Sequence, residues 1–250
     1  MSNDSTTLKA TCYNCAKPAK INTEGGLELP ENMRIILARH GRTEWNGAAR
    51  FQGKTDVPLT EEGRTQAKAL ARRLSSWPLE AVYTSPLSRA VYTAEAIAGA
   101  HELKPIVLPE LREIDFGVWE GESIPDLDAK QHTQYTRWRA DPFFNPPPEA
   151  ETWPVLSARL ERAVKIILES GYSRVVVVSH GGIMRAIYAV FLGLNAHKVW
   201  NMDVSNCAMS GIEMRYGRPC LVFENDDLHV RAGKAGEDLP VWGDGHAVKL

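Results

Sequence analysis

The chain has 250 residues, of which 44% are hydrophobic and 24% charged, as in ordinary globular proteins that bury their own core. The formal net charge of −2 argues against a general nucleic-acid partner, which would need a basic surface. No stretch approaches the roughly 20 apolar residues that cross a bilayer, and the polar start from Met1 to Lys9 lacks the apolar core of a secretory signal. We therefore expect a cytoplasmic protein that contacts neither nucleic acid nor membrane.

The first residues are expected to form an extension, because positions 1–32 carry few periodic apolar side chains. They include Cys12 and Cys15, whose spacing is that of half a zinc site. No second pair of this kind follows in the sequence. Two thiols without a metal are therefore favoured, and zinc completed by distant residues or by another subunit is the alternative. We expect the folded domain to span 33–224 and a tail to cover 225–250.

Short apolar runs rich in valine, isoleucine and leucine predict the strands. In chain order these lie at 33–38, 81–84, 106–108, 174–179, 207–214 and 219–224. Helical spacing and capping residues predict helices between most of them, beginning after Thr60, at Pro86, at Thr152 and after Gly182.

The alternation of strands and helices predicts an α/β fold with a mostly parallel sheet, covered by helices on both faces. The last two strands follow each other with no room for a crossover helix, so one edge of the sheet is expected to be antiparallel. Ligands of such sheets bind beyond the carboxyl ends of the strands. Residues that directly follow a strand are therefore the candidates for a ligand site.

Two strands are each followed by a histidine and a glycine. The run 35–38 leads into Arg39 and His40, and the run 175–178 leads into His180. Arginine offers a planar fork for phosphate, and histidine serves as a nucleophile or proton carrier. Taken alone, either histidine is explained equally well as a structural residue that caps its strand. Two of them at strand ends favour one site assembled from both strands.

A loop after the first histidine contains Asn46, Gln52 and Gly53. Side-chain amides and a glycine that permits close approach suit the oxygens of a phosphate or a substrate. The same residues are equally typical of a turn that bonds its own backbone. The sequence alone leaves both interpretations open.

Arg89 is expected in the first turn of the helix that follows the strand 81–84. A cation there opposes the helix dipole, at a cost of a few tenths of a kcal/mol unless an anion lies nearby. This unfavourable placement favours a functional arginine over a solvated one.

Three carboxylates follow the third predicted strand, and any of them could act as a general acid beside a cationic pocket. They are Glu113, Asp115 and Glu120. Their spacing does not choose among them. Asp115 and Glu120 are better suited to holding the loop by accepting hydrogen bonds from backbone amides.

Together these segments resemble the histidine phosphatase superfamily, which includes cofactor-dependent phosphoglycerate mutases and α-ribazole phosphatases. The resemblance extends from about Arg34 to Met214. It implies a three-layer α/β/α sandwich with His40 as nucleophile and Glu113 as proton donor. It also implies a phosphate pocket of Arg39, Asn46, Gln52, Gly53, Arg89, His180 and Gly181.

The resemblance further implies a phosphohistidine mechanism on a small phosphate ester, such as α-ribazole phosphate or a sugar phosphate. Neutral His40 attacks phosphorus, Glu113 protonates the leaving oxygen, and Glu113 then activates water. The arginines and a protonated His180 stabilise the phosphoryl oxygens, so no metal or cofactor is required. A homodimer and a monomer are both compatible with the sequence.

Two features favour a phosphatase over a mutase. Mutases of this superfamily carry a basic residue directly after the catalytic glutamate, where this chain has Ile114, and their interval between that glutamate and the second histidine is longer. A phosphoglycerate mutase remains the alternative enzyme. A phosphate-binding module without catalysis is the alternative class.

One segment departs from the related phosphatases, which often have Gly-Gly-Glu-Ser after a proline-rich loop. This chain has Glu149, Ala150, Glu151 and Thr152 there. We expect Glu151 to keep the acidic position and Thr152 to cap the next helix. Trp138, Phe143 and Phe144 precede this loop and suit either an apolar lid or ordinary packing.

Overall fold

The structure is a computed structural model that describes residues 32–130 and 132–231. Its strands are β1 (Arg34–Arg39), β2 (Ala81–Thr84), β3 (Ile106–Val107), β4 (Arg174–Ser179), β5 (Met209–Arg215) and β6 (Arg218–Asp226). Its helices are α1 (Glu44–Gly47), α2 (Glu61–Leu74), α3 (Ser88–Gly99), α4 (Ile124–Lys130), α5 (His132–Ala140), α6 (Trp153–Leu168), α7 (Gly181–Val190) and α8 (Leu228–Arg231). Short 3-10 turns are η1 (Pro109–Leu111), η2 (Gly117–Trp119) and η3 (Val199–Asn201).

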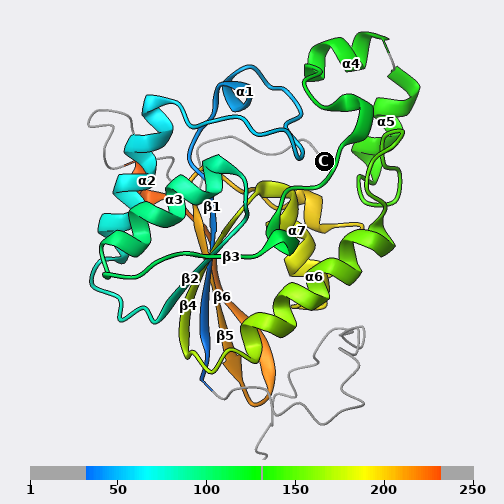
Figure 1. Cartoon of the computed structure of the whole chain (residues 1–250). Helices are drawn as coiled ribbons and strands as arrows, with labels where there is room; N and C mark the ends of the chain where they lie inside the picture. Colours follow the sequence, from blue (N-terminus) through cyan, green and yellow to red (C-terminus); the bar gives the residue numbers. More distant parts are fainter. Residues whose placement is uncertain (1–31, 131, 232–250) are drawn as a thin grey trace, which may run out of the picture.

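The sheet of the described residues has the order β3-β2-β4-β1-β5-β6. β1, β2, β3 and β4 pair in parallel, whereas β5 runs antiparallel to β1 and forms a hairpin with β6 at one edge. Figure 1 shows α2 and α3 on one side of this sheet and α6 and α7 on the other. The predicted α/β/α sandwich, mostly parallel with an antiparallel edge, is confirmed.

Two apolar cores form because successive strand residues point to opposite faces of the sheet. Ile36 and Ala38 of β1 lie in the core beneath α2 and α3, and Ile35 and Leu37 lie in the core beneath α6 and α7. The four valines 175–178 of β4 are all buried, since helices cover both faces of this central strand. Full burial of such a side chain stabilises the fold by about 1.5–3 kcal/mol.

Residues 225–231, which the sequence assigned to a tail, carry regular structure. β6 continues to Asp226, and α8 follows over Leu228–Arg231, so regular structure extends past residue 224. Val230 packs against the core beneath α2 and α3, and Arg73 forms an ion pair with Asp226 at 3.6 Å. These contacts with distant residues stabilise regular structure in a segment that is too polar for its sequence alone to predict it. Residues 1–31, with Cys12 and Cys15, lie outside the described residues.

Candidate active site

The two strand-end histidines lie side by side. β1 and β4 are neighbours whose last residues, Arg39 and Ser179, are paired in register. His40 and His180 directly follow them, with ring centroids 5.1 Å apart, and both side chains are buried. The structure thus brings the two predicted histidines together from neighbouring strand ends.

His40 has a defined tautomer. Its Nδ1 lies 2.7 Å from the carbonyl oxygen of Gly41, and because a carbonyl only accepts, Nδ1 carries the proton. Burial, with added repulsion from Arg89 and Arg39, lowers the pKa of His40 well below its ordinary value. The ring is therefore neutral at physiological pH, with a lone pair on Nε2.

Gly41 is required by close packing. A Cβ at this position would lie 2.3 Å from the carbonyl oxygen of Gly63, in the first turn of α2. The turn that carries His40 thus rests directly on the start of that helix. Thr60 caps the helix as expected, since its hydroxyl accepts a hydrogen bond from the Gly63 amide at 3.1 Å.

His180 lies at the N-cap position of α7 and is also neutral. Arg89 donates from Nε to its Nδ1 at 3.3 Å, so Nδ1 has no proton, and Nε2–H donates to the Ser85 hydroxyl at 2.7 Å. Burial, followed by repulsion from Arg89, lowers the pKa of His180 well below its ordinary value. Burial and the adjacent Arg89 cation thus favour the neutral ring, whereas the resemblance implied a protonated His180 during phosphoryl transfer.

Arg89 lies in the first turn of α3, as predicted, and is fully buried. Its guanidinium donates to the carbonyl oxygens of Gly53 and Thr55, both at 2.8 Å. Burial lowers its pKa, and the nearby Glu113 carboxylate opposes that shift. Carbonyl dipoles and a carboxylate therefore compensate for the cation at the helix N-terminus.

Arg39 offers an unsatisfied donor to the site. One guanidinium nitrogen, Nη1, donates to the carbonyl oxygen of Val204 at 2.6 Å, whereas the buried Nε has no partner among the described residues. Burial lowers the pKa of Arg39 to about 10, so the group stays cationic at neutral pH. A buried cationic N–H without an acceptor is suited to an anion.

The amides of the expected loop hold the turn itself. The Asn46 side-chain oxygen accepts from the Thr43 amide at 3.0 Å and closes a capping box at α1, and Gln52 accepts from the Thr43 hydroxyl at 3.0 Å. Gly53 has φ +56°, and a Cβ there would collide with the Glu120 carboxylate. Of these three residues, Gly53 contacts one of the site's arginines, because its carbonyl oxygen accepts a hydrogen bond from Arg89.

The structure separates the three candidate carboxylates. Glu113 is buried, and its oxygens accept from the Ile114 amide at 2.9 Å and the Gly182 amide at 3.3 Å. Its charge interacts with both Arg39 and Arg89. Glu113 therefore lies beside Arg39 and Arg89, the two arginines next to the histidines.

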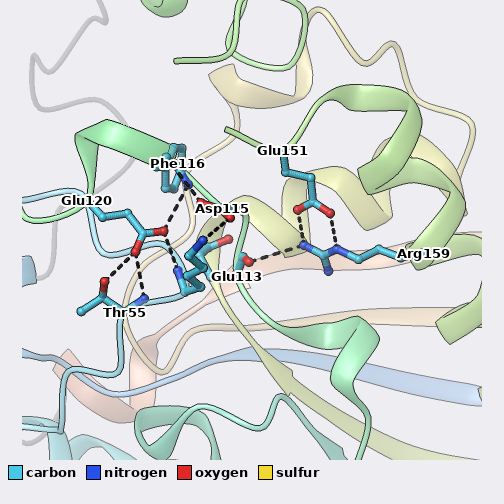
Figure 2. A network of polar contacts seen from close by, with 9 residues as sticks. Thr55, Glu113, Asp115, Phe116, Glu120, Glu151 and Arg159 are labelled. Carbon is cyan, nitrogen blue, oxygen red and sulfur yellow. Dashed lines mark hydrogen bonds and ion pairs between the residues drawn. The ribbon is translucent and has the colours of Figure 1, made fainter. Parts of the chain in front are cut away.

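The other two carboxylates hold the surrounding loops, as expected. Glu120 accepts from the amides of Lys54, Thr55 and Phe116, and Asp115 accepts from the Gly117 amide (Figure 2). Asp115 also forms an ion pair with Lys54 at 2.6 Å. Hydrogen bonding to Lys54 contributes to a lowered Asp115 pKa, despite the opposing effect of burial.

The segment that departs from related phosphatases keeps the acidic residue and bears backbone strain. Glu149 has φ +61°, in the left-handed region that favours glycine, which costs about 1–2 kcal/mol. Glu151 forms a buried ion pair with Arg159. Thr152 occupies the N-cap position of α6, but its side chain makes no capping hydrogen bond. Trp138 and Phe143 pack into the core, and Phe144 is exposed.

Sequence reasoning missed three polar residues of the site. Ser85 orients His180, Asn206 donates to the His40 carbonyl oxygen at 3.1 Å, and Thr93 accepts from the Gly41 amide at 3.2 Å. Only Ser85 carries a local signal, since it directly follows β2. The described part of the chain contains no group of three or more His, Cys, Asp or Glu residues that could hold a metal ion. None of its helices is long and apolar enough to cross a membrane.

Comparison with known proteins assigns this fold and site to a class. Residues 35–227 match the model of the histidine phosphatase superfamily, branch 1. The chain belongs to this superfamily, and the resemblance drawn from its motifs is confirmed.

Individual relatives agree with this assignment. Phosphoserine phosphatase 1 of Hydrogenobacter thermophilus is 34% identical over 79% of this chain and 94% of its own. A probable phosphoglycerate mutase of Proteus mirabilis is 36% identical over 72% of this chain and 85% of its own. The crystal structure of a putative α-ribazole-5′-P phosphatase from Escherichia coli matches with a TM-score of 0.71 at 31% identity. The match covers 78% of this chain and 97% of that structure. The expected enzyme class, a phosphatase for small metabolites, is supported by these similarities.

Proposed function

We propose that the protein is a metal-independent phosphomonoesterase that hydrolyses a small phosphate ester through a phosphohistidine on His40. The observation that carries this proposal is the pairing of two buried, neutral histidines 5.1 Å apart, one of them bonded to the buried cation Arg89. The Nε2 lone pair of His40 is a nucleophile that needs no separate base.

In the first step, His40 Nε2 attacks phosphorus while Glu113, as general acid, gives a proton to the departing oxygen. The P–N bond forms, the P–O bond to the leaving group breaks, and Glu113 becomes a carboxylate. In this proposal Arg39, Arg89 and the amide of Gly181 at the start of α7 hold the non-bridging oxygens.

In the second step, the Glu113 carboxylate takes a proton from water, whose oxygen attacks phosphorus. The P–N bond breaks, inorganic phosphate leaves, and His40 returns to its neutral form. The negative phosphoryl group opposes the repulsion from Arg89 and favours the protonated form of His180. A protonated His180 would thus accompany phosphate binding.

The proposed substrate is a monoester of a small metabolite. Relatives named phosphoserine phosphatase and α-ribazole phosphatase point to phosphoserine and α-ribazole 5′-phosphate as the first compounds to test, followed by sugar phosphates. Charged esters of this kind do not cross a bilayer unaided, so the proposed site of action is the cytoplasm, where they are made.

A phosphoglycerate mutase is the second candidate, because several relatives at 33–36% identity are named as probable mutases. Ile114 argues against it. Its buried side chain occupies the position where mutases of this superfamily carry a basic residue for the substrate carboxylate.

A substrate panel tests the proposal. The purified enzyme is assayed with EDTA present for phosphate release from phosphoserine, α-ribazole 5′-phosphate and several sugar phosphates, and for isomer exchange of 3-phosphoglycerate with 2,3-bisphosphoglycerate. We expect phosphate release from at least one ester and its loss in His40→Gln. Isomer exchange faster than phosphate release would favour the mutase. Phosphate binding without any turnover would favour a binding module.

A further inference from the structure

A buried ion pair connects α6 to the loop that precedes it. Arg159 Nε and Nη2 each lie 2.7 Å from one oxygen of the Glu151 carboxylate, so the contact is bidentate (Figure 2). The two side chains are only 6% and 3% exposed. A buried pair of this kind gains little net stability over apolar packing, because both charges lose their hydration. Its contribution is therefore expected in the backbone that Arg159 contacts rather than in stability.

The remaining donors of Arg159 contact the segment that carries Glu113. Nη1 donates to the carbonyl oxygens of Glu110 and Arg112, and Nη2 donates to the carbonyl oxygen of Glu113 at 3.4 Å. A guanidinium has five N–H groups, and all five have an acceptor here. One side chain of α6 thus contacts three backbone carbonyls within four consecutive residues.

Two further bonds hold the same segment. The Ser179 hydroxyl at the end of β4 donates to the Leu111 carbonyl oxygen at 2.8 Å, and the Glu151 amide donates to the Asp115 carbonyl oxygen at 2.9 Å. The backbone on both sides of Glu113 is therefore fixed from α6, from the loop before it and from β4. Glu113 has little freedom to move relative to the histidines.

We propose that Arg159, oriented by Glu151, is a positioning residue that places the Glu113 carboxyl for proton transfer to the leaving oxygen. The proposal rests on the proposed function, in which Glu113 is the general acid. Proton transfer of this kind contributes about 10²- to 10⁴-fold to a rate, and a displacement of about 1 Å can remove 10²-fold. Arg159 acts through the geometry of Glu113 and does not itself contact the substrate.

The test is the dependence of kcat/KM on the leaving group in Arg159→Lys. Lysine keeps the positive charge and can pair with Glu151, but its single nitrogen cannot contact three carbonyls and a carboxylate in the same fork. An alkyl phosphate needs its leaving oxygen protonated, whereas p-nitrophenyl phosphate releases a stable phenolate. We expect a fall of roughly 10- to 100-fold for the alkyl ester and less than about threefold for the aryl ester.

Arg162→Lys is the matched control, since Arg162 lies on the same helix, is exposed, and donates to the carbonyl oxygen of Ala158 in its own helix. Arg162→Lys should leave kcat/KM unchanged for both the alkyl and the aryl ester. Equal losses on both esters in a folded Arg159→Lys protein would overturn the proposal, because they would indicate a structural effect alone. If this variant does not fold, Glu151→Gln replaces it and must show the same selectivity for the alkyl ester.

Glu113→Gln separates failure of this inference from failure of the proposed function. We expect it to show the strongest leaving-group dependence, and Arg159→Lys to add no further selective loss in its background. If Glu113→Gln itself shows no leaving-group dependence, the proposed acid is wrong. If Glu113→Gln shows it and Arg159→Lys does not, only the positioning is wrong.

Discussion

At the scale of single residues, His40 and His180 are both neutral but carry their proton on different ring nitrogens. The proton of His40 is fixed on Nδ1 by a backbone carbonyl, whereas that of His180 is excluded from Nδ1 by an arginine donor. In both, burial is the largest cause of the lowered pKa. The first contact leaves a lone pair on His40 Nε2, the proposed nucleophile, and the second joins His180 to Arg89 in the proposed phosphate pocket.

The two buried histidines predict a loss of stability in mild acid. An unfolded histidine takes up its proton near pH 6.5, whereas the folded pKa of each lies well below. Their stabilisation is therefore fully present above pH 6.5 and falls as the pH drops towards the folded pKa, by up to about 1.4 kcal/mol per pH unit for each histidine. Urea unfolding of wild type and His40→Gln at pH 7.5 and 5.5 measures this. Between pH 7.5 and 5.5 the free energy of unfolding should fall less in His40→Gln than in wild type. Equal losses would contradict a lowered pKa of His40 in the folded protein.

The sequence predicted which residues come together better than it predicted their hydrogen-bond partners. Arg39, His40, Arg89 and His180 each adjoin a strand end, and strand ends of parallel sheets converge, so local patterns sufficed. Arg159 could not be found this way. It lies in the middle of a helix, and its backbone carbonyl acceptors are 46–49 positions away in the sequence.

At the scale of elements, the loop between α1 and α2 is held from two sides. Arg89 donates to the carbonyl oxygens of Gly53 and Thr55. Glu120 accepts from the amides of Lys54 and Thr55, and Figure 2 shows its contact with Thr55. The loop therefore lies between a cation of the phosphate pocket and a carboxylate outside it. Movement of the loop would release the guanidinium of Arg89.

Removing the Glu120 carboxylate should weaken phosphate binding. Glu120→Ala leaves the Lys54, Thr55 and Phe116 amides without their acceptor, and bonds to a charged group contribute about 1.5–3 kcal/mol each. We expect the inhibition constant of inorganic phosphate to rise about tenfold, which corresponds to about 1.4 kcal/mol. Isosteric Glu120→Gln keeps part of the network and should show a smaller rise. An unchanged constant in Glu120→Ala would show that the loop does not hold Arg89.

Helices and strands with a strong hydrophobic or capping pattern were predicted closely. The errors lie in segments whose structure depends on contacts with residues far away in the sequence. The strand at 174–179 and the helix after Thr60 have the bounds that valine runs and capping predict. β5 starts at Met209, two residues later than expected, because Cys207 has φ +57° and bends the chain first. The helix α8 has no signal of its own and depends on packing against α2.

For the whole molecule, we propose that the domain starting at residue 33 contains the complete activity. Met33 is fully buried, and its carbonyl oxygen accepts from the Met214 amide at 2.8 Å, so the fold is anchored from its first strand. Removing residues 1–32 should leave kcat/KM within about twofold of the full chain. Zinc analysis of the reduced full chain, before and after this removal, tests the expectation that Cys12 and Cys15 hold no metal. Loss of activity without loss of folding would assign the extension a part in the reaction.

The central claim is that His40 carries the phosphoryl group during turnover. Rapid quenching of the enzyme with a reactive phosphomonoester, followed by peptide mass spectrometry, measures it most directly. We predict an acid-labile, base-stable phosphoryl group on the peptide that contains His40, formed within the first turnover and absent from His40→Gln. Turnover at the normal rate with no modification of His40, or with the phosphoryl group on another residue, would contradict the account.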